Sequence, residues 1–188
     1  MKKVLVPDVW IEGGNVSLRL VTLKDCTPIY VNWLCDREVN AFLETRWTEQ
    51  TMDSVREFVR RSMTAEDIYL LGIIENCSGQ HIGNIKLGPI HPIHSHADVS
   101  YFIGEKRCWG RGYATQAISL VTAFGFERLE LHRLQAGVYA TNIGSIRALK
   151  KVGYVLEACF RQQLRLNGKW EDHLFYGLLR DSWTARRA

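Results

Sequence analysis

Two glycines separated by one arginine, Gly110 and Gly112, are the residues of this chain best suited to bind a charged ligand. They follow an alternating apolar segment, 99–103, which is typical of a strand, and they precede apolar residues at helical spacing over 114–124. A glycine loop at a helix start lets backbone N–H groups converge beside the positive end of the helix dipole. The segment therefore predicts a site for a phosphorylated ligand.

The loop is not one of the two commonest phosphate loops. A P-loop has four residues between its glycines and then Lys-Ser/Thr, but Gly104 and Gly110 are too far apart and an arginine follows. A dinucleotide fingerprint needs a small residue where Thr115 stands and an acid at the end of the next strand, whereas Glu130 precedes that strand. A plain connection between a strand and a helix stays open as an alternative. Two nearby cations favour anion binding over it: Arg107 and Arg111.

These residues carry a family resemblance. The segment 107–112 resembles the R/Q-x-x-G-x-G/A loop of the GCN5-related N-acetyltransferases (GNAT), which binds the pyrophosphate of coenzyme A. The segment 142–154, with Asn142-Ile143-Gly144-Ser145 at its start, is similar to that family's second signature. The chain resembles the RimJ/RimL-like branch of this family in particular, and the resemblance extends from about Leu18 to Phe175. Two motifs in the right order are a far more specific signal than one.

The resemblance implies an α/β fold, the GNAT acyl-CoA N-acyltransferase fold. We expect a mixed, mostly antiparallel sheet of about seven strands flanked by four helices, in a single domain over 1–188. The implied reaction is transfer of an acetyl group from acetyl-CoA to a primary amine. The acceptor is either a small molecule, such as an amino-sugar nucleotide, or a protein N-terminus.

The resemblance also implies which residues bind the co-substrate. Backbone groups of the strand before the loop would bond the pantetheine, the loop and helix start would hold the pyrophosphate, and the asparagine of the second motif would meet the pantetheine amides. The expected cofactor contacts are Phe102, Ile103, Arg107, Trp109, Gly110, Arg111, Gly112, Tyr113, Ala114 and Asn142.

The catalytic groups are expected to be Asp98 and Ser145. Asp98 stands at a strand start where relatives carry a carboxylate, and a solvated acid is the alternative. Ser145 stands where some relatives place a hydroxyl beside the thioester sulfur, and a local helix-start hydrogen bond is the alternative. The family's usual tyrosine is absent, because Lys150 occupies its position. That departure is the one feature in favour of a non-catalytic acyl-CoA-binding module.

Three histidines and an acid lie within 91–98 and could suggest zinc. Their spacing matches no closed tetrahedral pattern and no Cys pair accompanies them, so we expect no metal. A loop bordering the acceptor groove, with imidazoles that hydrogen-bond the acceptor, is the preferred interpretation.

The elements that must position these residues follow from periodicity and turn signals. The order is one strand, two helices, three strands, a helix, a strand, a helix and two strands. The expected ranges are 16–21, 25–34, 51–63, 68–75, 81–87, 97–103, 113–128, 134–138, 142–152, 160–166 and 174–178. Thr51 or Asp53 can cap the second helix, and Asn167-Gly168 is a strong signal for a two-residue hairpin turn.

Composition narrows the remaining possibilities. The chain has 188 residues, 46% of them hydrophobic, which is enough for one sizeable core. A net charge of +4 suits a polyanionic co-substrate, but no basic stripe interleaved with aromatics predicts nucleic-acid binding. Apolar runs are too short for a membrane span. Five scattered cysteines indicate unpaired thiols and a cytoplasmic protein. Sheet edges could support a homodimer, although nothing in the sequence demands one.

Overall fold

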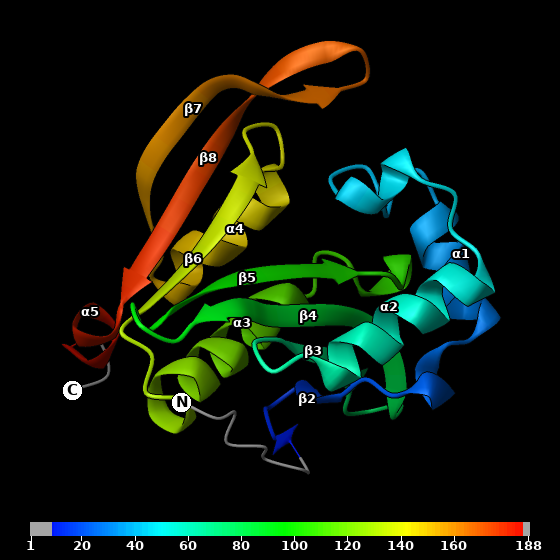
Figure 1. Ribbon diagram of the computed structural model, residues 1–188, viewed down its shortest axis with the longest axis horizontal. Coiled ribbons are helices and arrows are strands. Elements are labelled where there is room, and N and C mark those ends of the chain that lie inside the picture. The colour runs from blue at the N-terminus through cyan, green and yellow to red at the C-terminus, as the bar shows by residue number, and fades with distance from the viewer. Residues whose placement is uncertain (1–8, 186–188) are drawn as a thin grey trace.

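An eight-stranded mixed sheet organises residues 9–185, the part of the chain that this computed structural model describes (Figure 1). The strand order is β1-β2-β3-β4-β5-β6-β8-β7, and every neighbouring pair is antiparallel except β5 and β6. The strands are β1 (Trp10–Ile11), β2 (Val16–Leu20), β3 (Tyr69–Glu75), β4 (Gln80–His91), β5 (His96–Ile103), β6 (Arg133–Tyr139), β7 (Val155–Leu166) and β8 (Lys169–Leu179).

The helices cover both faces of the sheet. They are α1 (Pro28–Cys35), α2 (Met52–Thr64), α3 (Tyr113–Ala123), α4 (Ile143–Val152) and α5 (Arg180–Ala185). Short 3-10 helices are η1 (Leu23–Asp25), η2 (Glu44–Trp47) and η3 (Lys106–Cys108), and a π-helical turn, Phe124–Arg128, extends α3. The Thr51 side chain accepts a hydrogen bond from Ser54 N, so Thr51 is the N-cap of α2. Gly153 ends α4 at φ 113°, where a side chain would be strained.

The α/β class and the mixed, mostly antiparallel sheet are confirmed. The extra strand β1 has two residues and the extra helix α5 has six, both too short for periodicity to reveal. β7 begins at Val155 instead of 160, because its first half is largely exposed and lacks a clean apolar alternation. The regular part of α3 ends at Ala123, where the π-helical turn takes over. Asn167 and Gly168 both have positive φ, as the hairpin turn requires.

Two hydrophobic clusters divide the molecule. The larger one packs α3 and α4 against one face of the sheet through residues such as Val99, Ile118 and Leu149. The smaller one packs α1 and α2 against the other face, where Leu70 and Phe102 meet Tyr30 and Val55. We call the side of the sheet that carries α1 and α2 the acceptor face. Within residues 9–185 there is no helix of the length and hydropathy that a membrane span requires.

The parallel pair β5–β6 stays together over only three residues of each strand. His96 to Asp98 pair with Arg133 to Gln135, and no pairing follows. Beyond that point the two strands diverge, as Figure 1 shows for the ribbons of β5 and β6. An opening between two central strands leaves their backbone groups without strand partners, which is where a ligand can supply them.

Candidate active site

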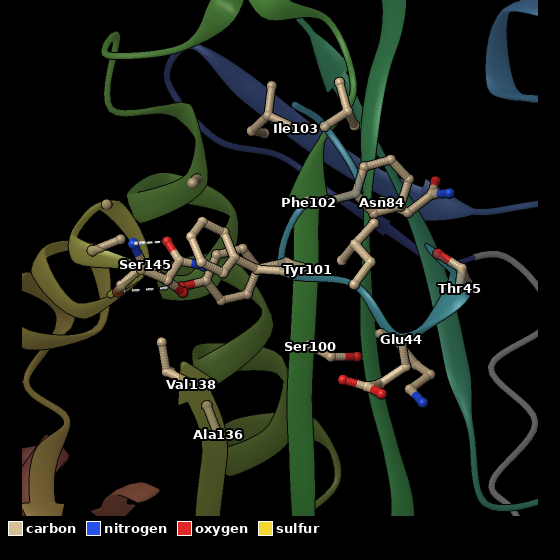
Figure 2. A pocket seen from close by; sticks show the side chains of 18 of the residues that line it. Glu44, Thr45, Asn84, Ser100, Tyr101, Phe102, Ile103, Ala136, Val138 and Ser145 are labelled. Atoms are coloured by element: carbon tan, nitrogen blue, oxygen red, sulfur yellow. Dashed lines mark hydrogen bonds between the residues drawn. The ribbon is translucent and has the colours of Figure 1, made fainter. Parts of the chain in front are cut away.

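A cavity of about 1180 Å³ lies where β5 and β6 separate. Its walls come from 99–103 of β5, 136–139 of β6, the connection between α1 and α2, and the first turns of α3 and α4. Figure 2 shows Tyr101 and Ser145 on one side of β5, and Glu44 and Ser100 toward its other side. The cavity therefore reaches both faces of the sheet.

The backbone of β5 presents alternate residues to the opening. Gly104 N donates to Ile82 O at 2.8 Å, so Gly104 is turned toward β4. Antiparallel pairing alternates with a period of two, so the backbone N–H and C=O groups of Phe102 also point toward β4. The backbone N–H and C=O groups of Tyr101 and Ile103 point toward the opening. The Ile103 carbonyl already accepts a hydrogen bond from Trp109 Nε1 at 2.8 Å. Phe102 lines the cavity through its side chain.

The glycine loop forms the other end of the cavity. Gly110 has φ 74° and Gly112 φ 80°, the left-handed region that only glycine adopts freely. An ideal Cβ at either position would have no atom within 4 Å, so the space in front of the loop is open. Gly112 is the N-cap of α3 and contributes no side-chain cap, which leaves the first-turn N–H groups available to a ligand.

The arginines predicted to hold phosphate do not line this cavity. Arg107 instead donates to buried Glu75 from Nη1 and Nη2, both at 3.2 Å, and to Gln80 Oε1 at 2.6 Å. Arg111 is exposed and also lies outside the lining. Arg107 was expected to hold the pyrophosphate directly, but its geometry favours an ion pair with Glu75. The buried Glu75 carboxylate requires a cation beside it.

Glu75 joins the two ends of the glycine loop. Arg107 precedes the loop, and Tyr113, which donates to Glu75 Oε1 at 3.1 Å, follows it. Ser78 Oγ donates to the same carboxylate at 2.6 Å. Hydrogen bonds from Ser78, Arg107 and Tyr113 outweigh burial and lower the pKa of Glu75 to about 2. The loop is thereby anchored to the end of β3.

The second motif forms the floor of the cavity. Asn142 Oδ1 accepts from Ser145 N at 3.1 Å and caps α4. Ser145 Oγ lies 2.5 Å from the hydroxyl of Tyr101, and Figure 2 shows both bonds as dashed lines. Burial raises the pKa of Tyr101 to about 12, so its phenol stays protonated at neutral pH. Tyr101 is a functional candidate that the sequence did not single out.

Asp98 lies apart from these groups. Its carboxylate accepts from Gln135 Nε2 at 2.6 Å, across the last paired residues of β5 and β6. The cavity lining on this strand begins at the next residue, Val99. Most of the other predicted residues do meet at the cavity: Phe102, Ile103, Trp109, Gly110, Gly112, Tyr113, Ala114, Asn142 and Ser145.

The acceptor face of the cavity carries polar residues that no motif predicted. Tyr139 on β6 donates to Glu44 Oε1 at 2.6 Å, and Arg46 Nη2 donates to the Tyr139 oxygen at 2.7 Å. Lys86 on β4 and His173 on β8 also line the cavity. Glu44 and His173 are 129 positions apart by their numbers, so only the folded chain brings them to one site.

The histidines of 91–98 lie elsewhere. His91, His94 and His96 stack their rings, with centroids 4.5 Å apart for His91 and His94, but none of them lines the cavity. Among residues 9–185, no three His, Cys, Asp or Glu side chains are placed to hold a metal ion.

Comparisons with known proteins agree on one family of enzymes. The model of the acetyltransferase (GNAT) domain matches residues 15–155. The chain is 34% identical over 126 residues to the probable N-acetyltransferase YjcK of Bacillus subtilis (strain 168), covering 66% of this chain and 68% of that protein. It is 33% identical to the uncharacterized N-acetyltransferase YnaD of the same organism, covering 93% and 99%.

Solved structures agree on the fold. A GNAT-family acetyltransferase from Bacillus anthracis superposes with a TM-score of 0.79 at 21% identity, covering 92% of this chain and 99% of that one. RimL, a ribosomal L7/L12 α-N-protein acetyltransferase in complex with coenzyme A, superposes with a TM-score of 0.82 at 17% identity, covering 93% and 99%.

Proposed function

Because the chain belongs to the GNAT acetyltransferase family and is an acetyl-CoA-dependent N-acetyltransferase, we propose that its acceptor is a primary amine on a small polar molecule. The molecule would carry hydroxyl or anionic groups, as an amino-sugar nucleotide does. The observation that carries this proposal is the mixed charge of the acceptor face, where Glu44 and Lys86 line one cavity.

We assign the co-substrate to the opening between β5 and β6. The diphosphate would bind the amides from Trp109 to Ala114, since the space before Gly110 and Gly112 is open and the helix start has free donors. The pantetheine would continue along β5 and bond the backbone of Tyr101 and Ile103, the residues that face the opening. The Nδ2 group of Asn142, whose Oδ1 is occupied by capping, would donate to a pantetheine carbonyl.

The acceptor face suits an acceptor molecule that carries one ammonium group and whose other groups are neutral or anionic. Glu44 is the natural partner of the ammonium, because the Tyr139 and Trp47 donors hold its carboxylate in place. Lys86 is half-buried and makes no ion pair with any residue in 9–185, so it would repel a second positive charge. Ser100 lies directly across from Lys86 on β5 and can bond a hydroxyl.

A protein N-terminus is the second candidate acceptor. The β7–β8 hairpin extends past the rest of the sheet (Figure 1), and it exposes Phe160 and Trp170. Exposed aromatic side chains of this kind are common where peptides bind.

Release of the CoA thiol, measured against a panel of amines, tests the proposal. The panel contains amino-sugar phosphates and nucleotides, spermidine and short peptides with free N-termini. We expect turnover with an anionic amino sugar and little with spermidine, and Lys86→Glu should shift that preference toward spermidine. Turnover with spermidine alone, unaffected by Lys86→Glu, would contradict the proposed acceptor class.

A further inference from the structure

We propose that His173 is the general base that takes the proton from the attacking amine. This assignment rests on the proposed function, because it needs an amine acceptor on the same face of the sheet. His173 lies on β8 directly opposite Tyr139 of β6, and paired residues share a face. Since Tyr139 bonds Glu44, the imidazole belongs to the acceptor face, and it lines the cavity there.

The hydrogen-bond partner of His173 determines which ring nitrogen is the base. Nδ1 lies 2.8 Å from Oε1 of Gln163. An amide oxygen can only accept, so Nδ1 carries the hydrogen and Nε2 keeps its lone pair. A neutral imidazole held in this tautomer is the arrangement that a general base requires.

Gly137 gives the imidazole its position. A Cβ on Gly137 would collide with His173 Nε2, so the ring rests directly on the backbone of β6 at that glycine. Gly137 is itself part of the cavity wall, two residues beyond the last pair of β5 and β6. Nε2 is thereby held beside the opening in which we place the thioester.

The surroundings keep the ring neutral. Burial lowers the pKa of His173, and the Glu44 carboxylate acts in the opposite direction. The other ionisable groups around this end of the cavity are the Arg46 guanidinium, which donates to the Tyr139 oxygen, and the Tyr139 phenol, which donates to Glu44. Glu44 serves better as the ammonium partner than as the base, because Tyr139 and Trp47 already donate to its two oxygens.

The proposed step conserves protons and bonds. The ammonium bound beside Glu44 first gives one proton to solvent. The neutral amine nitrogen then attacks the thioester carbonyl carbon, and His173 Nε2 takes the proton that the nitrogen loses as the N–C bond forms. The C–S bond then breaks, and the thiolate receives a proton from the Tyr101–Ser145 hydroxyl pair on the opposite face. Solvent restores that hydroxyl proton and accepts the one on His173. The products are the amide and the CoA thiol.

The test compares His173→Gln with a matched control, His132→Gln, whose side chain is exposed and outside the cavity. We expect His173→Gln to lower kcat by about 10²-fold or more, with an unchanged Kd for acetyl-CoA. In the wild type, kcat/KM should fall at acidic pH as the His173 imidazole becomes protonated. The part of this fall that is due to the imidazole should be absent from His173→Gln. Added imidazole should restore part of the rate, and His132→Gln should behave as wild type.

Gly137→Ala provides a second variant that keeps the imidazole but moves it. We expect a lower kcat, and no further loss when the change is made in the His173→Gln background, because both act through one group. An active wild type with an equally active His173→Gln variant would overturn the base assignment alone. A wild type that binds acetyl-CoA and acetylates no amine would instead overturn the proposed function.

Discussion

The hydroxyl of Tyr101 lies 2.5 Å from Oγ of Ser145 and links β5 to α4 beneath the opening between the strands. Both side chains lie on the face opposite to α1 and α2, whereas His173 and Glu44 lie on the acceptor face. In the proposed mechanism the sheet therefore separates the two proton transfers: the amine loses its proton on one side, and the sulfur gains one on the other.

Removal of the Tyr101 hydroxyl should slow turnover without weakening co-substrate binding. Because the pKa of about 12 keeps the phenol protonated, Tyr101→Phe deletes a proton donor, and we expect kcat to fall by about 10²-fold. Tyr154→Phe is the control, since that hydroxyl bonds Thr122 in the core and lies outside the cavity. Equal kcat values for the two variants would remove Tyr101 from the mechanism.

The role of the glycine loop in binding acetyl-CoA can be tested with a control glycine that has a similar backbone conformation. Acetyl-CoA at 100 times its Kd should stabilise the wild type by about 2.7 kcal/mol. Gly112→Val should lose that stabilisation, because its side chain would occupy the space in front of the loop. Gly79→Val has a similar positive φ, in a turn between β3 and β4, and should keep it. Retained stabilisation in Gly112→Val would refute the loop assignment.

Much of this fold could be predicted because its signals are local. The Gly110–Gly112 loop, the Asn142 cap and the Asn167-Gly168 turn each depend on neighbours in the sequence. The partner of Arg107 could not be predicted in this way, because Glu75 lies at the end of β3, 32 positions earlier. An arginine beside a phosphate loop has the same sequence signature whether it meets a ligand or a buried carboxylate.

The acceptor face was harder to predict for the same reason. Glu44, Tyr139 and His173 come from three separate segments and share no motif. Their meeting depends on the register of β6 with β8 and on the path of the α1–α2 connection. In the sequence Gly137 has no feature that separates it from an ordinary strand glycine, yet the His173 ring packs directly against it.

Asp98 should prove more important for stability than for turnover. Its carboxylate fastens the last paired residues of β5 and β6 through Gln135. Asp98→Asn keeps an oxygen acceptor and should retain most of the wild-type kcat. Asp98→Ala should lower the free energy of unfolding by about 1.5–3 kcal/mol, the range for a hydrogen bond to a charged group. A large loss of kcat in Asp98→Asn, with acetyl-CoA binding intact, would restore Asp98 as a catalytic residue.

Acid should destabilise the fold through two carboxyl groups. Hydrogen bonds from Ser78 and Arg107 lower the pKa of Glu75 to about 2. Burial opposes the ionisation of Asp25, but donors from Arg19 and Thr22 prevail and its pKa is also about 2. Both groups ionise in the unfolded chain near pH 4, so their contribution is complete above that pH and disappears as the pH falls toward 2. Urea titrations at a series of pH values should show this decline.

Glu75→Gln isolates one of the two contributions to that decline. Between pH 5 and 2 the unfolding free energy of the variant should decrease less than that of the wild type. The difference should equal the contribution of one carboxyl group whose pKa is lowered by folding. An identical pH dependence in the variant and the wild type would mean that Glu75 is not the ionised centre described above.

A crystal structure of the complex with acetyl-CoA would test most directly the claim that acetyl-CoA binds in the opening between β5 and β6. We predict that the diphosphate contacts the amides from Trp109 to Ala114, that the pantetheine bonds Tyr101 and Ile103, and that the thioester lies between His173 and Tyr101. A diphosphate bound away from Gly110 and Gly112, or a thioester outside the opening between β5 and β6, would contradict it.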